Sequence, residues 1–185
     1  MEHLAIAALE AGLDVVRRSP TDAGTVAMIV RRPAVDAREI LGAAALDPSC
    51  GVVGDTWDAR GSSRTDDGSA HPEMQLTLMN VRFATLIAGS LERAALAGDQ
   101  LYVDLSLGYD TLPPGTRLEL GTAAIEITSQ PHRGCKKFVA RFGADALRLA
   151  NSPAGRALNL RGIYAHVVRA GSVHRGDPIQ IVAQA

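Results

Sequence analysis

The sequence is poor in cysteine, in aromatic residues and in long apolar runs, and each shortage excludes a class of protein. Only two of the 185 residues are cysteines, too few for the disulfide framework of a small secreted domain. Aromatic residues make up 4% of the chain, without the repeated basic and aromatic pattern of many nucleic-acid-binding surfaces. The apolar run from Leu4 to Leu9 is far shorter than the ~20 residues that span a membrane. We therefore expect neither nucleic acid nor a membrane among the partners.

Lysine occurs at only two positions, Lys136 and Lys137, and this scarcity bears on cofactor chemistry. An enzyme with its own pyridoxal phosphate needs a Schiff-base lysine, and two lysines on one short loop suit that role poorly, so we expect no intrinsic pyridoxal phosphate. Phosphate-binding loops, dinucleotide fingerprints and the elbow motif of serine hydrolases are also missing from the sequence. The chain starts with Glu2 and His3 and lacks the basic start of an export signal. These features predict a cytoplasmic protein.

The hydrophobic pattern predicts a mostly β protein of the α+β class, a β-barrel with a few peripheral helices. Helices are expected at 2–17, 37–46, 83–97 (with a break at Gly89-Ser90) and 141–151. Strands are expected at 25–32, 75–80, 101–107, 117–120, 124–128, 162–169 and 178–182, with a short extended piece at 51–57 and an exposed polar loop at 58–72. We expect one domain over 1–185, in which 1–20 is an N-terminal helical extension and 25–183 is the barrel with its helices.

The same pattern predicts how some strands are placed. The stretches 113–120 (PPGTRLEL) and 174–181 (HRGDPIQI) share a turn followed by alternation, which suits neighbouring barrel strands. The strands 117–120 and 124–128 are separated by Gly121-Thr122, which predicts a hairpin. Strict alternation of apolar and polar residues over 101–107 predicts a half-buried strand.

Positive charge is concentrated in the C-terminal third. Residues 127–175 contain nine basic residues and one acid, Asp145, and therefore carry a charge of +8, whereas the rest of the chain carries −9. Charge alone is compatible with a solvated basic face, with nucleic acid or with a small anionic ligand. The scarcity of aromatic residues weighs against nucleic acid. The residues around Cys135 favour the small anionic ligand.

Cys135 lies in the segment 131–138 (PHRGCKKF), beside Arg133, Lys136 and Lys137. Nearby cations favour the thiolate over the thiol, and a thiolate is what metal coordination, nucleophilic attack or persulfide carriage requires. An inert cysteine in an apolar pocket is the alternative, and it fits these flanking charges poorly. Cys50 has no cation within two residues, so we interpret it as a core or turn residue.

His132 and Cys135 also have the spacing of a metal pair, H-x-x-C. A structural zinc site needs four ligands, and a second local pair is missing from the sequence. His71, Glu73 and His166 would complete a set only if the tertiary structure brought them together. The motif alone is therefore weak support for zinc.

The segment 131–138, followed by 161–164 (RGIY) and 170–179 (AGSVHRGDPI), resembles the MOSC domain, a family named for the C-terminal domain of molybdenum cofactor sulfurases. The earlier stretches 51–55 (GVVGD) and 75–80 (QLTLMN) are also similar, so the resemblance covers most of residues 25–183. It implies a mostly β barrel, an essential cysteine, and a role with the molybdenum cofactor or with sulfur destined for metal centres. Many members have proline directly before the cysteine, where this chain has Gly134.

The resemblance and the local chemistry together assign the candidate site. A soft thiolate suits the metal, and guanidinium and ammonium groups suit the phosphate of an anionic pterin cofactor. Cys135 is the predicted metal ligand or persulfide carrier. The predicted cofactor-binding residues are His132, Arg133, Lys136, Lys137, Arg141 and Arg161. Asp55 and Asn80 are candidates for polar groups of the pocket by resemblance alone, and a turn-stabilising role is an equal alternative for each.

Three functions remain open from the sequence. The first is a module that binds molybdenum or its cofactor, or that carries sulfur as a cysteine persulfide received from a separate cysteine desulfurase. The second is a stand-alone molybdenum-dependent reductase of N-hydroxylated compounds, which takes electrons from a donor protein. The third is a barrel that binds another small anion. Only the first two depend on the resemblance.

Overall fold

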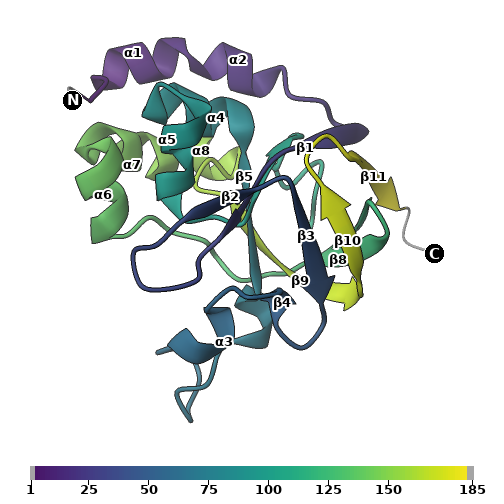
Figure 1. The fold of residues 1–185 in the computed structure, drawn as a ribbon. Coiled ribbons are helices and arrows are strands. Elements are labelled where there is room, and N and C mark those ends of the chain that lie inside the picture. The colour runs from purple at the N-terminus through teal and green to yellow at the C-terminus, as the bar shows by residue number, and fades with distance from the viewer. Residues whose placement is uncertain (1–2, 183–185) are drawn as a thin grey trace.

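The computed structural model describes residues 3–182 and contains a closed β-barrel of seven strands (Figure 1). Around the barrel, the strands follow the order β11 (Pro178–Val182), β7 (Arg117–Leu120), β8 (Ala123–Ile127), β9 (Ile163–Arg169), β5 (Leu76–Asn80), β6 (Leu101–Asp104) and β1 (Ala23–Arg31). Pairing of β1 with β11 closes the barrel. The predicted class, a mostly β barrel with peripheral helices, is confirmed.

Two of the predicted strand pairings are confirmed by the register. β7 and β8 form the expected hairpin, with Leu118 opposite Ile125. β7 also pairs with β11, with Leu118 opposite Ile181, so the two stretches with similar turns are indeed neighbours. All barrel pairs are antiparallel except β5 with β6. That parallel pair needs a crossover, which is made by α4 (Val81–Ala88), α5 (Leu91–Ala94) and the short 3₁₀ helix η2 (Ala95–Ala97).

The helix predicted at 37–46 is wrong. This segment forms β2 (Glu39–Leu41), which pairs with β1, and β3 (Ala43–Asp47). β3 lies between β10 (Gly171–His174) and β4 (Gly51–Val52) in a separate three-stranded sheet. The alanines favour a helix locally, but strand pairing satisfies the backbone here and lets Leu46 join the barrel core, where it is buried.

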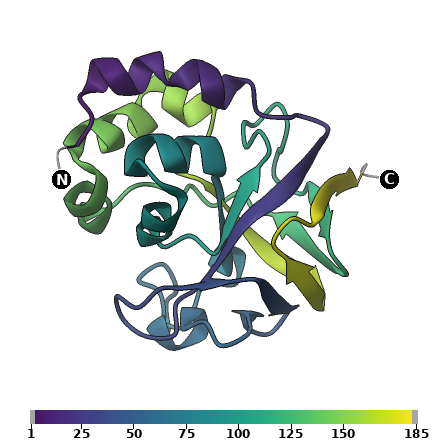
Figure 2. The same ribbon diagram turned by 45° about the horizontal axis from the view of Figure 1, so that its top comes forward.

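Most helices form a layer on one side of the barrel (Figures 1 and 2). The layer contains α1 (Ile6–Ala11), α2 (Leu13–Arg17), α4, α5, α6 (Lys136–Phe142), α7 (Ala144–Asn151) and α8 (Pro153–Ala157). At Gly89, α4 ends in the left-handed conformation, and Ser90 caps α5, so the predicted break in this helix is confirmed. Within residues 3–182, no helix is long and apolar enough to cross a membrane.

The barrel strands contribute to two apolar cores. One core fills the barrel, and the other lies between the barrel wall and the helical layer. Tyr102 of β6 is fully buried in the second core and its hydroxyl donates to the carbonyl oxygen of Ala94 at 2.8 Å. The strand predicted at 101–107 is present as β6, but the prediction that it is half-buried is wrong. The helices cover the face that the alternating pattern assigned to solvent.

Candidate functional site

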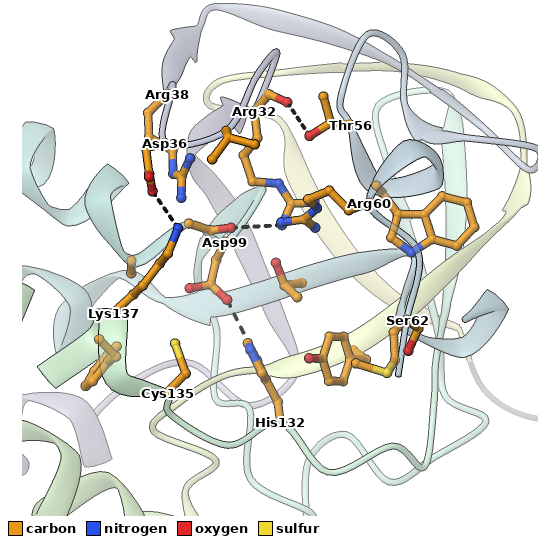
Figure 3. A pocket seen from close by; sticks show the side chains of 18 of the residues that line it. Arg32, Asp36, Arg38, Thr56, Arg60, Ser62, Asp99, His132, Cys135 and Lys137 are labelled. Atoms are coloured by element: carbon orange, nitrogen blue, oxygen red, sulfur yellow. Dashed lines mark hydrogen bonds and ion pairs between the residues drawn. The ribbon is translucent and has the colours of Figure 1, made fainter. Parts of the chain in front are cut away.

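A cavity of about 280 Å³ lies against the outer face of the barrel wall at Thr77 of β5 and Tyr164 of β9, between two parts of the chain that are distant in sequence. Its N-terminal wall consists of the segment 32–38 after β1 and the region around the short helix α3 (Trp57–Arg60). Its C-terminal wall consists of the 132–135 loop, α6 and the start of β9, with Asp99 between the walls (Figure 3). We call this space the basic cavity.

Cys135 lines the basic cavity and is exposed to solvent. It occupies the N-cap position of α6, and its side chain makes no capping hydrogen bond. The helix predicted at 141–151 is thus corrected: α6 starts directly after the cysteine, and Gly143, with φ of 90°, separates it from α7. Lys136 and Lys137 lie in the first turn of a helix rather than on a loop.

Gly134 has a packing role in this loop. A Cβ at this position would lie 2.2 Å from Cδ1 of Leu147, so a larger residue here would require the Leu147 side chain to move. The glycine therefore lets the loop pack closely on α7, and the space beside it is filled by Leu147 rather than left for a ligand.

Six cationic side chains and two carboxylates line the basic cavity. The cations are Arg32, Arg38, Arg60, Lys137, Arg141 and Arg161, and the carboxylates are Asp36 and Asp99. Such an excess of positive charge in a concave site attracts anions. Burial lowers the pKa of Arg38 below its ordinary value, and the positive charges of Arg141 and Arg32 lower it further. An anion placed among these groups would relieve their mutual repulsion.

Asp36 joins the two walls of the cavity (Figure 3). Its carboxylate accepts hydrogen bonds from Nζ of Lys137 at 2.8 Å and from Nη2 of Arg141 at 3.1 Å. The hydrogen bond from Lys137 is the main reason that the pKa of Asp36 lies below its ordinary value. Arg141 also donates to the carbonyl oxygen of Leu96 at 2.6 Å, so its guanidinium is held at the edge of the cavity.

Asp99 is a fully buried carboxylate at the back of the cavity. Nη1 of Arg161 donates to both of its oxygens, at 3.0 and 2.8 Å. Nδ1 of His132 lies 3.8 Å from Oδ1 of Asp99. Burial, followed by the positive charges of Arg161 and Arg32, lowers the pKa of His132 well below 6.5. His132 is therefore neutral near pH 7, and its contact with Asp99 is not an ion pair.

Asp55 holds Arg32 in place and does not line the cavity. Its carboxylate is fully buried and accepts three hydrogen bonds from Arg32, one from the backbone N–H and two from the guanidinium, at 2.7 to 2.9 Å. Breaking such a buried ion pair costs about 3–5 kcal/mol. Asp55 therefore acts through Arg32, which does line the cavity.

Asn80 also lies away from the cavity. Its Oδ1 accepts from the N–H groups of Arg82 and Phe83 and so caps α4, while its Nδ2 donates to Oγ of Ser19 and to the carbonyl oxygen of Leu105. With these four bonds the amide is fully occupied. The geometry gives Asn80 the turn-stabilising role that the sequence left open.

The structure thus brings five of the predicted residues together at the basic cavity: His132, Cys135, Lys137, Arg141 and Arg161. Arg133 lines a neighbouring cavity instead, and Lys136 is exposed and lines neither. Four further residues of the cavity were not predicted from the sequence: Arg32, Arg38, Arg60 and Asp99. The basic run 31–38 (RRPAVDAR) could have indicated the first two, whereas nothing in the sequence near Asp99 marks it as buried.

Three nitrogen atoms in the described part of the chain are buried without a hydrogen-bond partner: Nε of Arg38, Nδ1 of His132 and Nε of Arg161. All three belong to residues that line the basic cavity. A buried polar atom left unpaired costs about 1–3 kcal/mol, so such atoms are rare in native proteins. Their convergence on one cavity indicates a site for a ligand that supplies acceptors.

The described residues offer no group of three or more His, Cys, Asp or Glu side chains that could hold a metal ion. The zinc site suggested by H-x-x-C therefore has no further ligands from residues 3–182. The ring of His132 instead packs against Tyr164, with centroids 4.4 Å apart. Among the described residues that line the cavity, Cys135 is the one thiol, and Met74 adds a thioether sulfur.

Comparison with known proteins gives both a match in sequence and a match in fold. A family model described as MOSC domain matches residues 68–180. The fold is similar to that of the YuaD protein from Bacillus subtilis, with a TM-score of 0.64 and 15% identity over 88% of this chain and 97% of that one. It is also similar to YiiM from Escherichia coli (TM-score 0.55, 20% identity, 87% and 71% covered) and to YiiM from Geobacillus stearothermophilus (0.58, 17%, 86% and 75%). None of the curated proteins matches the chain significantly.

Proposed function

Because the chain belongs to the MOSC domain family, we propose that its basic cavity binds the molybdenum cofactor and that Cys135 is the protein ligand to the metal. The observation that supports this most directly is that one cavity is lined by an exposed thiol and by three residues that each carry a buried nitrogen atom without a hydrogen-bond partner. The cofactor is an anionic pterin that carries a phosphate and an oxo-metal centre, and when bound it supplies a redox-active metal.

The residues of the cavity fit both ends of such a cofactor. The Nε atoms of Arg38 and Arg161 are always donors, and phosphate or pterin oxygens are suitable acceptors. The volume of about 280 Å³ lies just below the ~300–1,000 Å³ that small-molecule sites occupy. The exposed Cys135 and Lys137 stand at its edge, so part of the ligand would extend beyond the enclosed space.

A single protein sulfur also fits a metal that arrives with its own organic ligands. A bare metal ion needs several protein ligands, and the described residues do not supply them. A metal already held by the pterin needs only one from the protein. The Cys135 thiol would lose its proton on binding, as thiol ligands do.

The other residues of the cavity have positioning and charge-balancing roles in this proposal. Lys137, in the first turn of α6, and Arg141, in its last turn, both line the cavity and would neutralise negative charge there. Asp99 holds the guanidinium of Arg161 in place by accepting hydrogen bonds from its Nη1. The neutral ring of His132, packed at a tilt of 40° against Tyr164, excludes water without adding charge.

Substitution of the two cysteines tests the proposal. The variants Cys135→Ser and Cys50→Ser are produced in a host that makes the cofactor, purified gently, and analysed for molybdenum and for pterin fluorescence. Cys135→Ser should lose molybdenum, whereas the wild type and Cys50→Ser retain both components. Because Cys135 is exposed, its substitution should change the melting temperature by less than about 3 °C.

Two results would overturn this assignment. One is full molybdenum content in Cys135→Ser, which would show that the sulfur is not a ligand. The other is a wild-type protein that retains neither molybdenum nor pterin under conditions in which a known cofactor-binding protein from the same host is loaded.

A sulfur carrier is the second candidate, because Cys135 is exposed and its side chain makes no capping hydrogen bond, so a partner protein can reach it. In this reaction the Cys135 thiolate attacks the terminal sulfur of a cysteine desulfurase persulfide, a new S–S bond forms on Cys135, and the desulfurase thiolate leaves. The test is to supply labelled sulfur and then to measure how much of it a thiol reductant releases from the protein. Release from the wild type and from Cys50→Ser, but not from Cys135→Ser, would support the carrier. A labelled, metal-free protein would favour it over the cofactor site.

A further inference from the structure

A second cavity of about 220 Å³ lies on the other side of the 131–133 loop. Its walls come from this loop, from the end of α7 and from α8, with Tyr109 at its edge. Cys135, Lys137 and Arg38 line only the basic cavity, and Arg133, Asn151 and Arg156 line only the second one. The second cavity is therefore a separate space and not an extension of the site described above.

All the charged side chains that line the second cavity are cationic. Arg133, Arg156 and Arg161 contribute to it, and no aspartate or glutamate of the described chain does. Arg133 and Arg156 are exposed and make no salt bridge to a described residue. In the basic cavity, by contrast, Asp36 and Asp99 offset part of the positive charge. Two free guanidinium groups around a small concave space attract oxyanions, which they bind through paired hydrogen bonds.

His132 and Arg161 form the wall shared by the two cavities. The side chain of His132 is 7% exposed and that of Arg161 is 9% exposed. Each has a buried nitrogen without a partner, Nδ1 of His132 and Nε of Arg161. More than nine tenths of each side chain is thus buried. Each of these two residues lines both cavities and carries one nitrogen atom that makes no hydrogen bond.

We propose that the second cavity binds a small ligand bearing a carboxylate or phosphate group, held by Arg133 and Arg156 with Arg161 at the shared wall. The remaining lining includes Pro131, Ala150 and Leu160, which leaves room for a compact apolar body next to the oxyanion. This inference does not rest on the identity of the cofactor in the basic cavity, since Arg133 and Arg156 line only the second cavity.

Amide chemical shifts of the full ¹⁵N-labelled chain test the proposal during titrations with inorganic phosphate and with benzoate. Gly155 and Asn151 report on the second cavity, and Gly61 and Gly98 report on the basic cavity. We expect saturable shifts at Gly155 and Asn151. The double variant Arg133→Ala/Arg156→Ala should weaken this binding about tenfold, as expected for the loss of charge-assisted hydrogen bonds from two exposed groups.

The matched controls separate the two cavities. Arg148→Ala, on the exposed face of α7, removes an arginine that lines neither cavity and should leave the shifts unchanged. Arg38→Ala should weaken only the response of Gly61 and Gly98. Tighter binding of benzoate would identify a carboxylate on an apolar body, and tighter binding of phosphate a phosphate group. The absence of saturable shifts at Gly155 and Asn151, or equal affinity in the double variant, would overturn the second site, whatever the basic cavity binds.

Discussion

His132 is a buried histidine that shares its surroundings with arginines. Its side chain is 7% exposed, and burial, Arg161 and Arg32 lower its pKa well below 6.5. A glycine makes this position possible: a Cβ on Gly162, which has φ of 100°, would lie 2.3 Å from the carbonyl oxygen of Leu78 and 3.3 Å from Nδ1 of His132. At the residue scale, the cavity wall therefore combines a neutral ring with fixed cations.

The pH dependence of stability follows from the pKa of His132. Below about pH 6.5 the unfolded chain binds a proton at this histidine that the folded protein excludes, so the free energy of unfolding should fall as the pH drops from 7 to 5. The slope from one such group reaches about 1.4 kcal/mol per pH unit. Urea unfolding at pH 5, 6 and 7 measures it, and His132→Asn should flatten the slope relative to the wild type.

His174→Asn is the control for this experiment, because His174 is an exposed histidine on β10. This variant shows how much the loss of an exposed histidine changes the slope of the free energy of unfolding against pH. If the slope for His132→Asn equals that of the wild type, His132 is protonated in the folded state and the wall is not neutral.

The segment 33–38 and the helix α6 are connected through one side chain. Asp36 accepts from Lys137 and Arg141 of α6, although its backbone lies in the left-handed region at φ of 60°. Non-glycine residues rarely adopt this conformation, and aspartate and asparagine tolerate it best. At the element scale, these contacts connect a loop and a helix that are about a hundred positions apart in the chain.

Asp36→Asn tests whether the Asp36 carboxylate competes with anions for Lys137 and Arg141. Asparagine tolerates the same backbone conformation and removes the charge. Without the carboxylate, Lys137 and Arg141 are free to bind an anion in the basic cavity. The affinity for inorganic phosphate, measured at the amides of Gly61 and Gly98, should rise several-fold and should depend more steeply on salt. Hydrogen exchange in 33–38 should become faster.

Asp22→Asn provides the comparison, since Asp22 is an exposed aspartate that lines neither cavity. An unchanged phosphate affinity in Asp36→Asn would mean that the carboxylate does not compete with anions for the two cations.

The helical layer and the barrel share one of the two apolar cores. Met28, Met79 and Tyr102 of the barrel strands pack in the same cluster as Leu9 of α1 and Leu149 of α7. Separation of the layers would expose both surfaces to water. At the scale of the whole molecule, we expect this arrangement to make a single folding unit, with the N-terminal helices as part of it.

Leu149→Ala tests this unity. Leu149 is 3% exposed, and its truncation should destabilise the protein by about 2–5 kcal/mol. Unfolding followed by far-UV circular dichroism and by the fluorescence of Trp57, the single tryptophan, should give coincident curves that both shift. Leu96→Ala, at a position that is 38% exposed, should shift them much less. A second transition, or a shift in only one signal, would show two independently folding units.

The sequence predicted well those features that depend on local patterns. The Gly121-Thr122 turn identified the hairpin of β7 and β8, and the shared turn motif identified β7 and β11 as neighbours. The charges around Cys135 located the C-terminal wall of the basic cavity. Local patterns failed where a long-range contact decided the outcome: the alanine-rich segment 37–46 became β2 and β3 because β1, β4 and β10 were available to pair with it.

The amino-acid sequence by itself determined the barrel class, the family and the position of the candidate thiol, because strand alternation, turn residues and the PHRGCKKF motif are all written in short stretches of chain. Only the tertiary structure decided which cations surround that thiol. Arg32 and Arg38 come from a loop a hundred residues away, and Arg133 points to a different cavity from Cys135 although it is two positions from it. The physical reason is that closure of the barrel and burial against the helices set these distances, and neither is encoded in local spacing.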